Sequence, residues 1–457
     1  MLRGIYMKIG LKTLYKNVLL TISIFLLIVG AGLLLIAAAY ALPVEKINIH
    51  VKESGASLQP EGNYWRMLPN SPYTNLDNYT DSLMLLTAAY DQTETDLFKR
   101  AMNNYHITIN NVSMPESCML LDSAEDRGYA LHHYGRYWHG YLVVLKPLLL
   151  FLNIDEIRQL NWLCIMGSAM VIGILLYHRK KLKYLFPYLL AICFMNPGTI
   201  ANSLQNSTIY HTASIGVILL LLLYGREKFR THMWLYFMVL GMVTSYFDLL
   251  TYPLVALGFP LVFSLIMTEG DTAGIRKALR ILGQLVLHSA MWGLGYVGMW
   301  GAKWILASLI TGQNYIVDAV YNISIRSGNV AFGEEFTLTT LYTALWYYMN
   351  ISRIWTLTLV FVVLCAAALC FGRKQWSAWP LTVAFLLIAL YPLLWGIGAR
   401  NHTYIHGLFT HRNWGLTILG LSCSPLPLIK SIRLKHLNLR KNKGSAENSE
   451  DTQCGSE

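Results

Sequence analysis

Two aspartates stand four residues apart in a polar stretch, directly ahead of an apolar run that begins at Leu83. Thr80 or Asp81 in that position suits the N-cap of a helix, and this structural interpretation accounts for one of the two acids. The functional interpretation is a carboxylate at a membrane–water boundary that accepts a proton from a sugar hydroxyl as a general base. Both interpretations stay open, and we take Asp81, with Asp77 as its alternate, as candidate catalytic residues.

A second cluster gathers acids, arginines and histidines within residues 122–139. Glu125 and Asp126 are further candidate catalytic acids. Arg136 and His139 are candidate ligands for a lipid phosphate, because guanidinium and imidazolium groups form charge-assisted hydrogen bonds with phosphate oxygens. The tyrosine and tryptophan residues beside them are suited to stacking on a polyol. The alternative is a solvated loop that caps a helix lying beneath it.

A third cluster near the end of the apolar part of the chain contains Arg400, His402, His406 and Arg412. The two histidines are four apart, so on a helix they share one face and could hold a metal ion. No carboxylate stands nearby in sequence, so a divalent metal cofactor stays open and we favour anion binding by the arginines. A polar interfacial loop is the alternative. Asp248 ends another apolar run and joins the substrate-binding candidates, because a carboxylate there lies at the surface or in a wet cavity.

The composition limits the classes of protein that can present such clusters. Of the 457 residues, 54% are hydrophobic and 13% are charged, and the mean hydropathy is +0.41. Soluble domains carry about 25% charged residues, so a water-exposed surface is excluded, and the aromatic content excludes a disordered chain. Long apolar runs without alternation predict an all-α integral membrane protein. No Walker A or GxGxxG motif supports nucleotide binding.

Ten apolar runs are candidate membrane spans: 18–42, 158–177, 184–196, 208–224, 233–250, 251–268, 281–310, 354–371, 378–396 and 413–430. The first is longer than the roughly 7–15 apolar residues of a cleaved signal peptide, so we expect an uncleaved span. With a cytoplasmic N-terminus, most of the 36 lysines and arginines face the cytoplasm. The net charge of +11 is therefore a topology signal and not a nucleic-acid footprint. Both termini are predicted to be cytoplasmic, in a multi-pass protein of a bacterial cell membrane.

The predicted parts are a cytoplasmic N-terminus with the first span (1–42), a large extracytoplasmic loop with juxtamembrane helices (43–157), a helical bundle (158–430) and a basic, disordered cytoplasmic tail (431–457). The segment from Trp138 to Leu152 is too short for a span. It is predicted to be an interfacial helix whose Lys146 snorkels to the surface. Lys303, inside a span, is expected to pair with an acid or to snorkel.

This layout resembles the GT-C superfamily of membrane glycosyltransferases, which have an uncleaved first span and a large outer loop with juxtamembrane helices. The likeness falls on Asp81, or Asp77, as the acid ahead of an apolar helix, and on the aromatic segment Tyr137-Trp138-His139-Gly140-Tyr141-Leu142. The family's closely spaced acidic pair and its Pro-Pro are absent from this sequence. The resemblance implies a polyprenyl-phosphate sugar donor, an acid that acts as base or contacts a metal, and phosphate binding by Arg400 and Arg412.

The sequence therefore predicts a membrane glycosyltransferase that moves a sugar from polyprenyl phosphate to a saccharide or lipid acceptor at the outer face. Its partners would be membrane lipid, donor and acceptor, without nucleic acid, and its oligomeric state is left open. The alternatives are a transporter or flippase, a polysaccharide ligase or polymerase of the cell envelope, and a non-catalytic envelope assembly protein.

Overall fold

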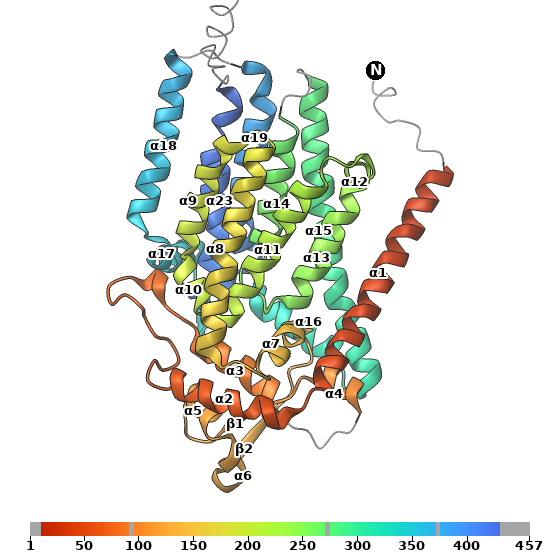
Figure 1. The fold of residues 1–457 in the computed structure, drawn as a ribbon, viewed down its shortest axis with the longest axis vertical. Coiled ribbons are helices and arrows are strands. Elements are labelled where there is room, and N and C mark those ends of the chain that lie inside the picture. The colour runs from red at the N-terminus through yellow and green to blue at the C-terminus, as the bar shows by residue number, and fades with distance from the viewer. Residues whose placement is uncertain (1–10, 91–95, 270–274, 372–374, 430–457) are drawn as a thin grey trace, which may run out of the picture.

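The computed structural model describes residues 11–90, 96–269, 275–371 and 375–429. It shows an all-α bundle with a smaller domain at one end, formed by the chain between the first two bundle helices (Figure 1). We call this smaller part, residues 43–153, the loop domain. The tail predicted at 431–457 lies outside the described residues, as does most of the basic N-terminal segment.

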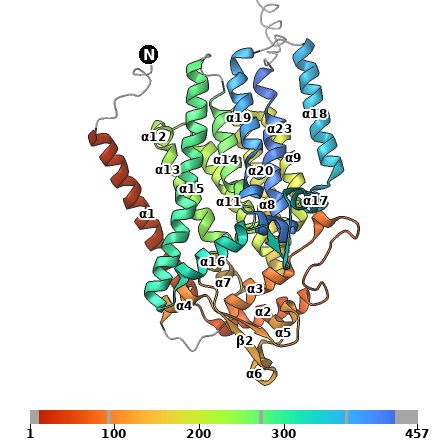
Figure 2. The same ribbon diagram turned by 180° about the vertical axis from the view of Figure 1, so that it is seen from behind.

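The bundle is built from helices that run between its two ends. They are α1 (Leu11–Tyr40), α8 (Ile154–His178), α9 (Leu185–Met195), α11 (Leu204–Leu223), α13 (Met233–Phe247), α14 (Leu254–Met267), α15 (Ile275–Thr311), α18 (Ser352–Phe371), α19 (Trp379–Ala389), α20 (Tyr391–Gly398) and α23 (Gly415–Cys423). The start of α1 and the end of α23 both lie far from the loop domain (Figures 1 and 2).

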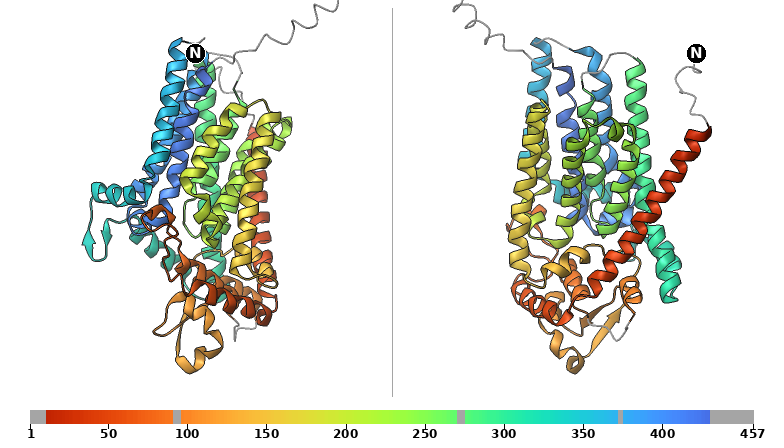
Figure 3. Two further views of the ribbon diagram at one scale, coloured as in Figure 1. Left: turned by 60° about the vertical axis from the view of Figure 1, so that its left-hand side comes forward. Right: turned by 45° about the vertical axis from the view of Figure 1, so that its right-hand side comes forward.

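Shorter elements connect these helices. They are α10 (Pro197–Ala201), α12 (Glu227–Thr231), α16 (Tyr315–Ser327), β3 (Val330–Ala331), β4 (Glu334–Glu335), α17 (Leu338–Met349), α21 (Arg400–Ile405), α22 (Gly407–Thr410) and the 3-10 turn η6 (His411–Trp414). Strands β3 and β4 pair antiparallel. Figure 3 shows that the α16–α17 segment projects sideways from the bundle near the loop domain.

The loop domain contains α2 (Val44–Leu58), α3 (Asn78–Ala89), α4 (Leu97–Asn103), β1 (His106–Ile109), α5 (Met114–Met119), α6 (Ala124–Arg127), β2 (Tyr129–His132) and α7 (Leu142–Leu148). Strands β1 and β2 pair antiparallel, with His106 opposite His132. They extend the domain away from the bundle and carry α6 at its far tip (Figure 1).

Five helices in the described part of the chain are long and apolar enough to cross a membrane: Leu14–Tyr40, Ile154–His178, Leu204–Leu223, Arg353–Cys370 and Trp379–Gly398. Three apolar helices there are shorter: Leu182–Met195, Met233–Phe247 and Leu254–Met267. A helix of about 15 residues reaches only about 22 Å, against a hydrocarbon core of about 30 Å. The all-α prediction is confirmed, whereas length and composition alone support fewer spans than the predicted ten.

Large apolar side chains are exposed on the outward faces of the bundle. Leu163 and Met170 on α8 expose 71% and 64% of their surface, and Leu359 on α18 exposes 63%. Monomeric soluble proteins rarely expose contiguous apolar surface of this extent. The exposed faces are therefore compatible with contact to lipid chains in a membrane.

Helices α13 and α15 are the most closely packed pair of the bundle. A Cβ atom added at Gly241 would overlap the carbonyl oxygen of Trp292, and one added at Gly295 would overlap that of Met238. Each glycine thus lets the backbone of the other helix approach, as small residues do between membrane helices.

We expect Gly295→Ala to destabilise the protein by about 1–3 kcal/mol, since the added methyl group must push the two helices apart. Gly293→Ala on the same helix is the matched control, because a Cβ there meets no atom of the described residues within 4 Å. Thermal unfolding in detergent measures both variants. Equal melting temperatures for the two would contradict the close contact.

Two buried lysines make fixed contacts at this end of the molecule: Lys146 joins α7 to α3 within the loop domain, and Lys303 joins the loop domain to the bundle. Lys146 on α7 is fully buried and donates to the Ala88 carbonyl oxygen at 2.8 Å. Lys303 on α15 is fully buried and donates to the carbonyl oxygens of Ala101 and Met102, each at 3.1 Å. The predictions for both lysines were wrong, because the ends of α3 and α4 bring neutral backbone acceptors to them.

Arg158 near the start of α8 makes a third connection. Its guanidinium donates to both carboxylate oxygens of Glu61 at 3.0 Å and to the Asn78 side chain at 3.2 Å. Helix α8 begins at Ile154 behind a capping box, so the predicted boundary between residues 157 and 158 falls inside this helix. The first bundle helix after the loop domain is therefore attached to it by a bidentate ion pair.

Candidate functional site

Asp81 connects the loop domain to the start of α11. The side chain is fully buried, and its oxygens accept hydrogen bonds from Ser203 Oγ at 3.2 Å, Leu204 N at 3.0 Å and Gln205 N at 3.2 Å. A helix N-terminus has amide groups without intrahelical partners and favours a negative charge. Asp81 thus caps α11, a helix distant in sequence. Burial is the main reason that its pKa is raised to about 7.

Asp77 is the N-cap of its own helix, α3. It is 3% exposed and accepts from the Thr80 amide at 3.1 Å, the Thr80 hydroxyl at 2.8 Å and the Gln205 side chain at 2.7 Å. Burial raises the pKa of Asp77, and the positive charge of Arg412 opposes that shift. On its other side lies Tyr64, whose pKa rises to about 12 through burial and then through the Asp77 charge.

Three tyrosines form a strip beside Asp77. The rings of Tyr64 and Tyr79 stack at 6.2 Å and are 56% and 39% exposed. Burial raises the pKa of Tyr134, and Arg136, Arg326 and Tyr79 all act electrostatically on its hydroxyl. We call Tyr64, Tyr79 and Tyr134 the tyrosine strip; the charge of Asp77 acts on Tyr64, and the charges of the two arginines act on Tyr134.

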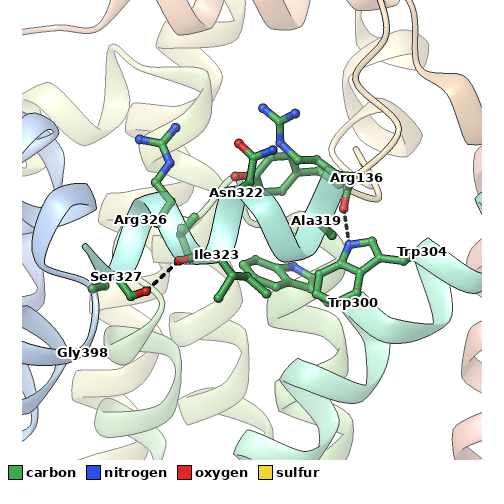
Figure 4. Close-up of a pocket in the computed structure, with 12 residues that line it drawn as sticks. Arg136, Trp300, Trp304, Ala319, Asn322, Ile323, Arg326, Ser327 and Gly398 are labelled. Carbon is green, nitrogen blue, oxygen red and sulfur yellow. Dashed lines mark hydrogen bonds between the residues drawn. The ribbon is translucent and has the colours of Figure 1, made fainter. Parts of the chain in front are cut away.

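The two arginines line a pocket of about 150 Å³ at the junction of the loop domain and the bundle. Its walls are Arg136, Tyr137, Leu250, Trp300, Trp304, Ala319, Asn322, Ile323, Arg326, Ser327, Gly398 and Ala399. Figure 4 shows the guanidinium groups of Arg136 and Arg326 on one side, with Asn322 between them, and the indoles of Trp300 and Trp304 on the other. We call this cavity the arginine pocket.

Among the described residues, each guanidinium group of the arginine pocket makes one polar contact with another side chain. Arg136 lies 3.4 Å from a carboxylate oxygen of Asp318, a half-exposed residue of α16. Arg326 donates to Nε2 of His406 at 2.8 Å. Burial, followed by the charge of Arg326, lowers the pKa of His406 to about 4, so the imidazole is neutral and can accept this bond. The arrangement leaves donors of both arginines for an anion.

Asp248 lies behind the arginine pocket. It is 1% exposed and accepts from the Thr251 amide at 2.8 Å and from the Tyr296 hydroxyl at 2.9 Å. Leu250, two residues on, lines the pocket with a positive φ of 65° and receives a hydrogen bond from His402 Nε2 at 2.5 Å. Asp248 therefore shapes the pocket wall without lining it.

Of the three arginines predicted to bind phosphate, Arg136 lines the arginine pocket, whereas Arg400 and Arg412 lie outside it. Arg412 is fully buried and donates to the carbonyl oxygens of Met195 and Leu408 at 3.1 and 2.8 Å and to the Thr199 hydroxyl at 2.6 Å. Its donors are used within the protein. Arg400 is half-buried beside the pocket and donates to the Ile397 carbonyl oxygen at 3.1 Å.

The second sequence cluster divides into two parts. Glu125 and Asp126 are exposed on α6 at the tip of the loop domain, away from the bundle, so they do not join the predicted cleft. His139 is 1% exposed and donates from Nε2 to the Tyr134 carbonyl oxygen at 2.9 Å, with its Nδ1 2.9 Å from the Tyr141 hydroxyl. His139 therefore contacts Tyr134 of the tyrosine strip and does not line the arginine pocket.

The predicted histidine pair has its rings close together, with centroids 4.8 Å apart. The Nε2 atoms of His402 and His406 are engaged by Leu250 and Arg326 respectively. Within the described ranges, no group of three His, Cys, Asp or Glu side chains could hold a metal ion. The pair therefore belongs to the support of the arginine pocket.

A larger hollow lies on another face of the bundle. This apolar groove has a volume of about 500 Å³ and is lined mainly by α8, α11 and α13, with α7 at its foot. Met84, one turn beyond Asp81, and Leu204 line the groove, so it passes beside the buried carboxylate without exposing it.

No family of known proteins, no curated protein and no solved structure matches this chain. Its chemistry is therefore inferred from the geometry of the site.

The structure brings Arg136, Asp248, His402 and His406, all of which the sequence singles out, to the arginine pocket or its support, whereas Asp77 contacts Thr80 and Gln205. It adds Arg326, Trp300 and Trp304, which sequence reasoning missed. Arg326 follows apolar and polar residues of α16 without another charge beside it, so no local pattern marked it. Its position in a segment predicted to face outward was the available signal.

Asp81 should make the stability depend on pH. Its folded-state pKa of about 7 lies above the usual value of about 4, so the folded protein binds this proton more tightly than the unfolded chain. Its contribution to the free energy of unfolding therefore increases as the pH falls from 7 towards 4. We expect the melting temperature of the wild type to gain more between pH 7 and pH 5 than that of Asp81→Asn. Equal gains would contradict the raised pKa.

Proposed function

We propose that this protein is a multi-pass membrane glycosyltransferase that uses a polyprenyl-phosphate sugar at the outer face of a bacterial cell membrane. In the proposed topology about ten helices cross the membrane, both termini are cytoplasmic and the loop domain lies outside. The observation that carries the proposal is the arginine pocket, where the guanidinium groups of Arg136 and Arg326 face the indoles of Trp300 and Trp304.

Each part of the candidate site suits one part of the donor. Arg136 and Arg326 can donate to phosphate oxygens, and guanidinium forks match phosphate geometry. The indoles of Trp300 and Trp304 give an apolar wall for the first isoprene units. Exposed tyrosine rings suit the face of a sugar, whose C–H groups pack on aromatic surfaces.

The transfer step requires one base. The acceptor hydroxyl oxygen attacks the anomeric carbon, the bond from that carbon to the phosphate oxygen breaks, and polyprenyl phosphate leaves with the electron pair. Asp77 takes the hydroxyl proton, and its raised pKa favours this role because a more basic carboxylate accepts a proton more readily. Asp77 and Asp81 each accept three hydrogen bonds within the protein. Asp77 is chosen as the base because its charge acts on Tyr64, which is 56% exposed.

A lipid transporter or flippase is the second candidate, because the apolar groove contains polar groups at Ser207, Thr208, His211 and Thr212. These residues cover five helical steps, or about 8 Å, whereas a track through the bilayer needs about 30 Å. Further along α11, the groove is lined by the apolar side chains of Ile215 and Leu219. The polar path therefore ends well inside the membrane, which favours the transferase.

The test is transfer from radiolabelled polyprenyl-phosphate hexoses to lipid and polysaccharide acceptors in proteoliposomes. We expect wild-type protein to release polyprenyl phosphate and label an acceptor. Asp77→Asn should lose about 100-fold or more in rate, as removal of a general base does. Arg326→Ala should lose about 10-fold or more through a weaker phosphate contact.

Arg127→Ala, an exposed change on α6, is the control and should retain full activity. Melting temperatures of all variants identify losses that arise from unfolding. Full transfer by well-folded Asp77→Asn would reject the base assignment. Transport of the donor without chemical transfer would favour the second candidate.

A further inference from the structure

A second pocket lies at the end of the bundle far from the loop domain. It has a volume of about 200 Å³ and is lined by Tyr224, Arg230, Met233, Thr268, Lys277, Arg280, Ile281, Gln284 and His288. Figure 1 shows α12 beside the upper turns of α15 at this end. We call this cavity the basic pocket, and it takes no part in the proposed transferase site.

The side chains of the basic pocket are almost entirely hydrogen-bond donors or apolar groups. Lys277, Arg280, Gln284 and His288 recur at spacings of three and four residues, so they occupy one face of α15. Arg230 comes to the same pocket from α12. Three cationic side chains and no carboxylate line the cavity within the described part of the chain, so its potential is positive.

The acid that directly follows a lining residue of the basic pocket points elsewhere. Glu269 follows Thr268, a lining residue, but its carboxylate lies 3.0 Å from the ammonium of Lys181 and also contacts that of Lys183. These two lysines lower the pKa of Glu269 against the opposing effect of its burial. The charge of Glu269 is thus matched by other groups, and it does not neutralise the basic pocket.

His288 supplies an independent indication of a ligand. It is 5% exposed, its ring stacks on Phe237 at 4.6 Å, and its Nδ1 has no hydrogen-bond partner among the described residues. Buried polar groups nearly always have a partner, so an orphaned atom lining a cavity indicates a missing one. Arg230 and Arg280 are exposed at the rim, whereas Lys277 and His288 are buried deeper.

The surroundings favour an anion that reaches the pocket from the membrane. Leu279, Leu282 and Val286 on adjoining faces of α15 are 48%, 47% and 60% exposed, which suits contact with acyl chains. Basic pockets between helices at the cytoplasmic side of membrane proteins bind anionic lipid headgroups. We propose that the basic pocket binds the phosphate group of an anionic ligand, with Arg230 and Arg280 at its rim and Lys277 and His288 inside.

The test measures binding of two phosphate sources to the full chain in detergent. Native mass spectrometry follows cardiolipin against phosphatidylcholine, and calorimetry follows inorganic phosphate. The variant is the double change Arg230→Gln and Arg280→Gln, whose exposed positions leave the fold intact. The matched control, Arg226→Gln with Arg276→Gln, removes two exposed charges, one at the N-cap of α12 and one on α15, that lie outside the pocket.

We expect cardiolipin to bind more tightly than phosphatidylcholine, the pocket variant to weaken it about tenfold or more, and the control to change it less than about twofold. His288→Phe, which keeps a ring against Phe237, should weaken binding as well. Binding of inorganic phosphate alone, with the same dependence on the variants, would support the site with a soluble ligand.

Two outcomes would overturn the proposal. Equal losses in the pocket variant and the control would mean that the arginines act only as general surface charge. Absence of binding by both phosphate sources to well-folded wild-type protein would remove the site altogether. Because neither readout uses sugar transfer, failure here leaves the proposed transferase activity unaffected.

Discussion

Charged side chains buried between the loop domain and the bundle are the constraint on which the rest of the structure depends. Asp81, Arg158 and Lys303 each reach a partner on the opposite side of that boundary. A buried charge without a partner costs several kcal/mol, so these contacts must form together or not at all. They fix the position of the loop domain over the bundle, and with it the place where Arg136 meets α15 and α16.

The hydrophobic pattern predicted the helical class, because that information is local. It could not assign Asp77 and Asp81, which stand one turn apart. Asp77 caps the helix that it begins, whereas Asp81 turns to the start of α11 more than a hundred residues later. Only the packing of α3 against α11 distinguishes these two acids, and no spacing rule contains it.

The remaining differences also arise from distant contacts. Glu125 and Asp126 are part of an acid-rich stretch like that of Asp77, but the β1–β2 pair carries them outward into solvent. Arg412 looked like a free phosphate ligand in sequence, yet carbonyl oxygens from α9 and α22 surround it. Arg326 is a candidate site residue because it lines the same pocket as Arg136, which lies almost two hundred residues before it. A site that is assembled from several distant segments therefore cannot be predicted from any one of those segments.

The backbone contact between α13 and α15 determines which wall of the arginine pocket is able to move. At Gly241 and Gly295 the two helices meet without side chains between them, so they form one rigid unit. Trp300 and Trp304 belong to that rigid unit, whereas Asn322 and Arg326 belong to α16. A short turn after Thr311 joins α16 to α15. A bulky ligand would therefore have to enter by an outward movement of α16 together with the β3–β4 hairpin, while the wall formed by Trp300 and Trp304 keeps its position.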